Sequence, residues 1–215
     1  MQLNVIRKVL SAAELELVRG RLAAATWVDG LASAGQQAGR VKNNRQLAVG
    51  SPDATELGEL VKKALLGHEH FAPLALPRRM SPPLFSRYEV GMEYGPHTDD
   101  AVRARDGLRT DLAATLFLSE LSEYDGGELV VLNSPVKLPA GDLVLYPATT
   151  VHRVAPVTRG ARLAVVFWVQ SLIRSHEQRE ILLSLHGVLT ALGEHPQALP
   201  LASVQQNLLR LWAEP

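Results

Sequence analysis

Five short β-forming runs, separated by turn residues, fill the middle of this chain and restrict its fold more than any other feature. Glycine, proline, asparagine and aspartate stand between the runs, as in Asp125-Gly126-Gly127. Parallel strands need crossover connections of about a dozen residues or more, and no helical segment of that length separates these runs. The pattern therefore predicts an antiparallel β-sandwich or barrel. The runs are Leu84–Val90, Leu112–Leu118, Glu128–Leu132, Asp142–Tyr146 and Arg162–Val169.

Helical patterns flank this β-rich region on both sides. Ser11 to Glu14 has the spacing of a capping box, in which serine and glutamate satisfy free backbone donors at a helix start, and Ser51-Pro52 opens a second helix. The same spacing recurs at Ser175 to Gln178 and at Ser203 to Gln206, each before an apolar helical stripe. We therefore expect a mainly β core with flanking helices. Its parts are an N-terminal helical support region (1–76), the β core (77–172), and C-terminal helices packed on the core or a partner subunit (173–215).

Composition excludes several classes of protein. Twenty-two basic residues balance 22 acidic ones, so the sequence gives no sign of a surface that binds nucleic acid. Cysteine is absent, which removes disulfides and thiolate chemistry. The N-terminus lacks the pattern of a signal peptide, and no apolar run is long enough to span a membrane. We expect a cytoplasmic protein without nucleic-acid or membrane partners.

Three possible metal ligands occur in a suggestive order, as His97-Thr98-Asp99 and, further along, His152. Side chains two residues apart on a strand point to the same face, so His97 and Asp99 reach one ion if the chain is extended there. Pro96 favours extended backbone in the residue before it. Two imidazoles and one carboxylate are the ligands of non-haem Fe(II) oxygenases, and they also suit catalytic zinc with a bound water.

Arg162 begins the last β-forming run. A charge beside such an apolar run is either solvated at the strand end or paired inside a pocket. The planar guanidinium matches a carboxylate through two parallel hydrogen bonds, which a lysine does not offer. A small acid such as 2-oxoglutarate, which chelates a metal at one end and carries a carboxylate at the other, would use both the metal and Arg162.

Four stretches of the sequence resemble the bacterial PKHD-type hydroxylases, which are Fe(II)- and 2-oxoglutarate-dependent dioxygenases. They are RYEVGMEYGPHTDD, RTDLAATLFLSE, YDGGELVV and GDLVLYPATTVHRVAPVTRGAR, all between about residues 80 and 170. The resemblance implies a double-stranded β-helix (jelly-roll) core, with iron held by His97, Asp99 and His152 and 2-oxoglutarate held by Arg162. It further implies hydroxylation of a substrate C–H bond with O₂, release of succinate and CO₂, and L-ascorbate as a supporting reductant. Related prolyl hydroxylases have a tyrosine that contacts 2-oxoglutarate at the position of Tyr88.

Three alternatives remain open from the residues alone. A Zn(II) hydrolase would use the same ligands, but it leaves Arg162 without a role. A jelly-roll sensor would bind metal and 2-oxoglutarate without turnover, and a purely structural barrel would tolerate loss of all three ligands. The substrate, a small molecule or a peptide, is not identified by the sequence, and a homo-oligomer could form through the C-terminal helices.

Other polar residues are weaker candidates. Tyr146 could contribute to a pocket as Tyr88 does. The polar stretch from Asp29 to Gln46 contains Val41–Gln46, which could form a lip over the metal, although a solvated loop is favoured. A solvated loop is also expected for the basic cluster of Arg103, Arg105 and Arg109. The remaining histidines have no ligand-like context, and these are His68, His70, His176, His186 and His195.

Overall fold

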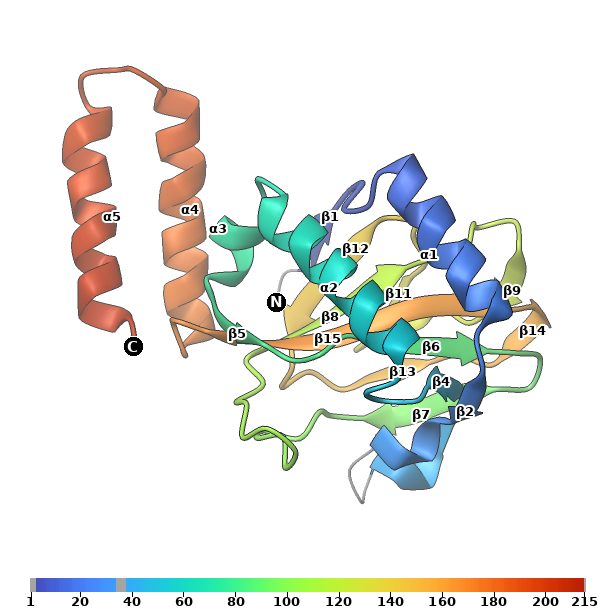
Figure 1. Cartoon of the computed structure of the whole chain (residues 1–215). Helices are drawn as coiled ribbons and strands as arrows, with labels where there is room; N and C mark the ends of the chain where they lie inside the picture. Colours follow the sequence, from blue (N-terminus) through green and yellow to red (C-terminus); the bar gives the residue numbers. More distant parts are fainter. Residues whose placement is uncertain (1–2, 34–37, 215) are drawn as a thin grey trace.

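Two antiparallel β-sheets form the centre of the protein (Figure 1). The computed structural model describes residues 3–33 and 38–214, and the counts below refer to these residues. The larger sheet has eight strands, with β5 (Pro77–Met80) added beside β15. The other strands of this sheet, in spatial order, are β1 (Asn4–Ile6), β12 (Leu143–Pro147), β8 (Leu112–Phe117), β15 (Arg162–Ser171), β6 (Leu84–Tyr88), β4 (Arg45–Leu47) and β2 (Trp27–Asp29).

The smaller sheet has five strands and contains the segment that carries His97. A separate pair, β14 (Val157–Gly160) with β9 (Tyr124–Gly126), extends one end of the core. The strands of the smaller sheet, in spatial order, are β11 (Ser134–Val136), β10 (Leu129–Val131), β13 (His152–Val154), β7 (Glu93–His97) and β3 (Lys42–Asn43).

The central strands of the larger sheet are buried on both faces. In β8, Leu112, Ala114 and Leu116 pack into the core under the helices, while Ala113 and Phe117 face a second apolar cluster together with residues of β10 and β11. This alternation follows from the two-residue period of a strand. It explains why β8 is apolar except for Thr115 and does not alternate between polar and apolar residues.

Helices cover the face of the larger sheet that points away from the smaller one (Figure 1). Val18 and Leu22 of the first helix and Leu57, Val61 and Leu65 of the second are buried there. The helices are α1 (Ala12–Ala24), α2 (Pro52–Gly67), α3 (Phe71–Ala75), α4 (His176–Leu192) and α5 (Ala198–Trp212), with short 3-10 turns η1 (Gly30–Ser33) and η2 (Ala38–Val41).

The helix starts test the capping predictions. Ser11 forms the complete reciprocal box with Glu14, and Ser51 caps α2. Ser175 accepts the hydrogen bond from Gln178 N, but its hydroxyl pairs with Glu177, so only half of the predicted box is present. The prediction for Ser203 is wrong, because α5 already begins at Ala198 and Ser203 lies inside it. The capping pattern is short and also occurs within helices, so it did not fix this boundary.

The N-terminal region is less purely helical than the sequence suggested. Strands β1, β2 and β4 join the larger sheet, and β3 joins the smaller one. The stretch from Asp29 to Gln46 therefore contributes β3 and β4 to the core, and its residues 34–37 lie outside the described residues. The predicted division at residues 76 and 172 remains a prediction.

The two C-terminal helices form an antiparallel hairpin that projects from the side of the β core (Figure 1). Arg179 anchors the start of α4, because its buried guanidinium donates to the carbonyls of Ile173 and Arg174 at 2.7 and 2.8 Å. The chain end returns to this base, where Glu214 N donates to Leu172 O. No helix among the described residues is both long enough and apolar enough to cross a membrane.

Candidate metal and 2-oxoglutarate site

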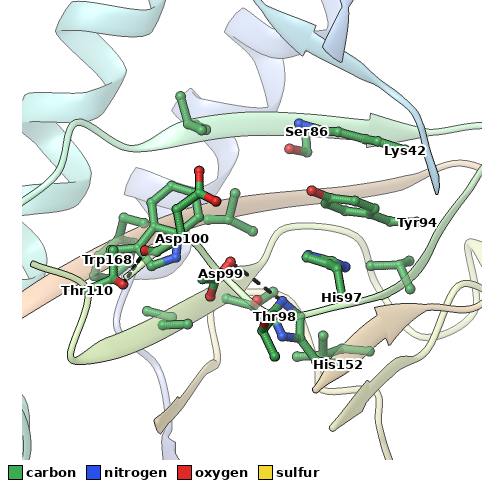
Figure 2. Close-up of a pocket in the computed structure, with 18 of the residues that line it drawn as sticks. Lys42, Ser86, Tyr94, His97, Thr98, Asp99, Asp100, Thr110, His152 and Trp168 are labelled. Carbon is green, nitrogen blue, oxygen red and sulfur yellow. Dashed lines mark hydrogen bonds and ion pairs between the residues drawn. The ribbon is translucent and has the colours of Figure 1, made fainter. Parts of the chain in front are cut away.

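Strand register brings the two histidines together. In the antiparallel pair of β13 with β7, His152 lies directly opposite His97. The ring centroids of the two histidines are 4.3 Å apart. Residues that are far apart in the sequence thus become neighbours on the smaller sheet, and both imidazoles point into the space between the sheets (Figure 2).

Asp99 completes a group of three possible metal ligands. One ligand atom from each of His97, Asp99 and His152 lies within 4.8 Å of the others, and this is the single such group found in the described part of the chain. Asp99 lies two residues beyond the end of β7, so the strand geometry considered for His97 and Asp99 does not extend to Asp99. Strand β7 ends at His97, which pairs with His152, the first residue of the neighbouring strand β13.

Backbone carbonyls orient both imidazoles. The Nδ1 atom of His97 lies 2.8 Å from Gly95 O, and Nδ1 of His152 lies 3.0 Å from Thr150 O. A carbonyl only accepts hydrogen bonds, so Nδ1 carries the proton and Nε2 keeps its lone pair. This arrangement is typical of metal-binding histidines, whose second nitrogen is held by a carbonyl or carboxylate. Nε2 of His152 lies 3.9 Å from Asp99 Oδ1 (Figure 2).

The electrostatics of the group also suit a cation. Burial, the neighbouring His152 and Lys42 lower the pKa of His97 to about 4, so its imidazole is neutral at physiological pH. Burial raises the pKa of Asp99, against the opposing effects of His152 and Trp168. Oδ2 of Asp99 is buried and has no hydrogen-bond partner among the described residues. A buried acceptor without a partner is costly, and a metal ion at this position would satisfy it.

Trp168 borders the same group and was missed by the sequence reasoning. Its indole lies close enough to Asp99 to lower the pKa of that carboxylate, although Nε1 makes no standard hydrogen bond within the described residues. The signal was available, because Arg162, Ala164, Val166 and Trp168 alternate along β15 and share one face of the strand.

Arg162 lies further along the same space and is almost fully buried, with 1% of its surface exposed. Arg162 is the first residue of β15, as predicted, and it lies opposite Tyr88 in the antiparallel pair of β15 with β6. Its guanidinium carbon lies 5.3 Å from the ring centroids of both Tyr88 and Phe117. The interpretation that this charge is solvated at the strand end is therefore wrong.

The guanidinium of Arg162 lacks an anionic partner. Its Nε and Nη2 atoms make no hydrogen bond to any described residue, and no ion pair with a described carboxylate includes it. The absence of a side chain at Gly127 leaves space for Arg162, because a Cβ at residue 127 would lie 3.1 Å from Arg162 Cδ. A buried cation without a counterion is strongly disfavoured, so this end of the cavity is suited to a carboxylate.

One cavity of about 260 Å³ connects the two features. His97, Asp99 and His152 line it together with Arg162 and Tyr88. Tyr146 also lines the cavity, with its ring centroid 5.2 Å from that of His152, and burial raises the pKa of its hydroxyl well above the usual value.

Polar side chains line one part of the cavity. Lys42 and Gln46 are buried and line it, so the interpretation of Val41–Gln46 as a solvated loop is wrong. Burial lowers the pKa of Lys42 to about 8, and its ammonium lies 5.4 Å from the ring centroid of Tyr94. The ring of Tyr94 in turn stacks on His97 at 3.7 Å (Figure 2).

Acidic neighbours hold two arginines of the basic cluster. Arg103 pairs with Asp106 at 3.3 Å, and Arg109 pairs with Asp111 and Glu214. The solvated-loop interpretation therefore holds for the exposed Arg105 but not for these two partly buried side chains. Arg103 and Arg105 also line the cavity.

Comparisons with known proteins agree with this geometry. A profile of the 2OG-Fe(II) oxygenase superfamily matches residues 83–170. A PKHD-type hydroxylase of Bordetella pertussis is 47% identical over 221 residues, which cover 97% of this chain and 98% of that protein. A PKHD-type hydroxylase of Methylobacterium nodulans is 46% identical over 222 residues, with the same coverage.

Solved structures share the fold at low sequence identity. A prolyl-4-hydroxylase from Pseudomonas putida has a TM-score of 0.54 at 21% identity, over 79% of this chain and 92% of that one. An oxidoreductase of the 2OG-Fe(II) oxygenase family from Burkholderia pseudomallei has a TM-score of 0.56 at 18% identity, over 77% and 84% of the two chains. Both likenesses support the jelly-roll core.

The fold and the near-complete sequence matches together define the class of protein, which is that of the Fe(II)- and 2-oxoglutarate-dependent dioxygenases. Within that class, this chain belongs to the PKHD-type hydroxylases. This membership implies Fe(II) as the metal cofactor and 2-oxoglutarate and O₂ as cosubstrates. The zinc-hydrolase alternative explains neither the family match nor the buried Arg162.

Proposed function

We propose that His97, Asp99 and His152 hold the Fe(II) of this dioxygenase. Two observations support the assignment, namely the imidazoles whose Nδ1 atoms are held by carbonyls and the unpartnered Oδ2 of Asp99. Two histidines and one carboxylate leave three coordination positions open on an octahedral ion. Those positions are sufficient for a bidentate acid and O₂.

We further propose that Arg162 binds the far carboxylate of 2-oxoglutarate and that Tyr88 borders the same carboxylate. The observation that carries the proposal is the buried guanidinium without a counterion, in the same cavity as the three ligands. The tyrosine hydroxyl stays protonated at physiological pH, because burial raises its pKa, and it can therefore donate a hydrogen bond.

The bound iron, with 2-oxoglutarate and O₂, supplies the oxidising power that hydroxylates a C–H bond. The protein contributes orientation and exclusion of water. His97 and His152 present lone pairs that are already aimed, so little reorganisation is needed. The cavity walls formed by the half-buried Trp168 and the buried Tyr146 help to exclude water from the reacting atoms.

The substrate proposed here is a small molecule or a peptide that reaches the iron past Lys42 and Arg105. L-Ascorbate is proposed as the reductant that restores Fe(II). The proposed compartment is the cytoplasm, because it is reducing and suits a chain without cysteine. The balanced net charge supports a protein that does not bind nucleic acid.

An anaerobic titration tests the assignment. Purified protein is freed of metal, Fe(II) and then 2-oxoglutarate are added, and the visible spectrum is recorded. We expect a weak charge-transfer band that requires both additions, followed by formation of succinate when O₂ is admitted. A band that persists unchanged in His97→Ala and Arg162→Met would refute the assigned residues, and a band without succinate would support a sensor.

A further inference from the structure

The C-terminal hairpin is a surface that the dioxygenase site does not use. It comprises α4 and α5, and α5 packs mainly on α4 (Figure 1). All residues of α5 are described, and none of them is buried. A stable helix in a globular protein normally buries one face, so this hairpin has more apolar surface than its own chain covers.

The hairpin also lacks the charges of an ordinary solvated surface. From Ile181 to Trp212 the sequence contains one acidic residue, Glu194, and one arginine, Arg210. Soluble surfaces usually carry charge on about a quarter to a third of their residues. Leucine, valine and alanine occupy many of the remaining positions, including Leu199 and Leu211, which are 79% and 76% exposed.

Four of the exposed apolar side chains, two on each helix, form two stripes on one side of the hairpin. Ile181 and Val188 are seven residues apart on α4, and Val204 and Leu211 are seven residues apart on α5, so each pair shares a helix face. The helices meet near Leu182 and Gln205, where Gln205 Nε2 donates to Leu182 O. Each contact residue follows a stripe residue by one position. In a pair of antiparallel helices, the residues that precede the contact residues by one position lie on the same side of the pair. Both stripes therefore face the same way.

We propose that this side of the hairpin binds the same side of a second copy of the chain, which gives a homodimer with a four-helix bundle at its centre. The face is roughly 25 Å long and 20 Å wide, since a 17-residue helix is about 25 Å long and packed helices lie about 10 Å apart. The flat area of this face is about 500 Å². The accessible surface of side chains that project from it is larger and approaches the roughly 800 Å² that each partner of a standard interface buries.

A second copy fits the chemistry of the face better than a membrane does. Two-fold interfaces must be self-complementary, and an uncharged apolar face meets this condition without any matching of charges. Helices that lie on a membrane are typically rich in lysine and arginine on their polar face. The stretch from Ile181 to Trp212 contains no lysine.

Sedimentation velocity of the full chain tests the proposal directly. The wild-type protein is expected to have twice the 23.4 kDa mass of the chain. Val188→Glu combined with Leu211→Glu would place like charges in the bundle, and we expect this variant to be monomeric at concentrations at least 100-fold above those at which the wild type dissociates. Leu66→Glu is the matched control, because Leu66 on α2 is 52% exposed and Val188 is 50% exposed.

Each outcome has a definite meaning. Unchanged circular dichroism and an unchanged Fe(II)/2-oxoglutarate band in the double variant would show that it is folded, and a monomer would then support the proposal. Mixing Val188→Glu with Val188→Lys chains should restore the dimer. A monomeric wild type overturns the proposal, whether or not that monomer binds neutral phosphatidylcholine vesicles. A double glutamate variant that remains dimeric also overturns it. The mass does not depend on the assigned iron ligands, so the proposed site and the dimer can fail separately.

Discussion

Replacement of Arg162 by methionine should weaken 2-oxoglutarate binding and at the same time make the protein without cosubstrate more stable. Methionine approximates the volume of the arginine stem and fills irregular apolar space. It removes the guanidinium, which is 1% exposed and whose Nε and Nη2 find no partner among the described residues. A residue whose main role is to bind a ligand often lowers the stability of the free protein.

The expected magnitudes follow from the surroundings of the guanidinium. Loss of one partner of a buried charge pair costs about 3 kcal/mol, which weakens binding of 2-oxoglutarate roughly 150-fold. An uncompensated buried ion costs several kcal/mol, and its contacts with the rings of Tyr88 and Phe117 return about 1 kcal/mol each. The free variant should therefore gain about 2 kcal/mol, or roughly 4–8 °C in Tm for a chain of this length.

Calorimetric titration of the metal-loaded protein and thermal unfolding without 2-oxoglutarate measure the two effects. Arg179→Met is the matched control, because Arg179 is also buried but donates to two backbone carbonyls. This control should lose about 3 kcal/mol of stability and keep its affinity for 2-oxoglutarate. The reasoning is refuted if Arg162→Met lowers Tm and leaves the affinity unchanged, since Arg162 would then be a structural residue.

Three further predictions concern the metal ligands, a helix cap and a turn. His97→Ala should abolish stoichiometric binding of Fe(II), measured by anaerobic titration, while circular dichroism remains that of the wild type. Ser11→Ala should lower the free energy of unfolding by about 1 kcal/mol at neutral pH, as measured by urea denaturation. The Ser11 hydrogen bonds lower the pKa of Glu14, so their contribution is present above the unfolded pKa and is lost as the pH falls through the folded value. The difference between Ser11→Ala and the wild type should therefore shrink below about pH 4, and a constant difference would contradict this cause. Gly160→Ala should cost about 3 kcal/mol in the same assay, because Gly160 has a φ of +70° and a Cβ there would lie 1.9 Å from a backbone carbonyl. Gly20→Ala, in an open helix position, should instead gain about 0.5–1 kcal/mol.

Much of the β core could be predicted because its signals are local. All five predicted runs contain strands, and the missing crossover helices correctly indicated antiparallel pairing. The strands that were missed are short, such as β13 with three residues, or contain a proline, as β7 does at Pro96. Short strands derive their stability from neighbouring strands, so their own sequence carries little signal.

The sequence by itself determined the candidate chemistry, because residue type decides which atoms can bind a metal or match a carboxylate. His97, Asp99, His152 and Arg162 were all proposed as candidates from their residue type, order and spacing. What only the tertiary structure decided is their mutual position. The register of β13 against β7 places His152 opposite His97, and burial of Arg162 beside Tyr88 leaves its charge without a counterion. Register and burial depend on contacts between segments far apart in the chain, and no local pattern encodes the free energy of those contacts.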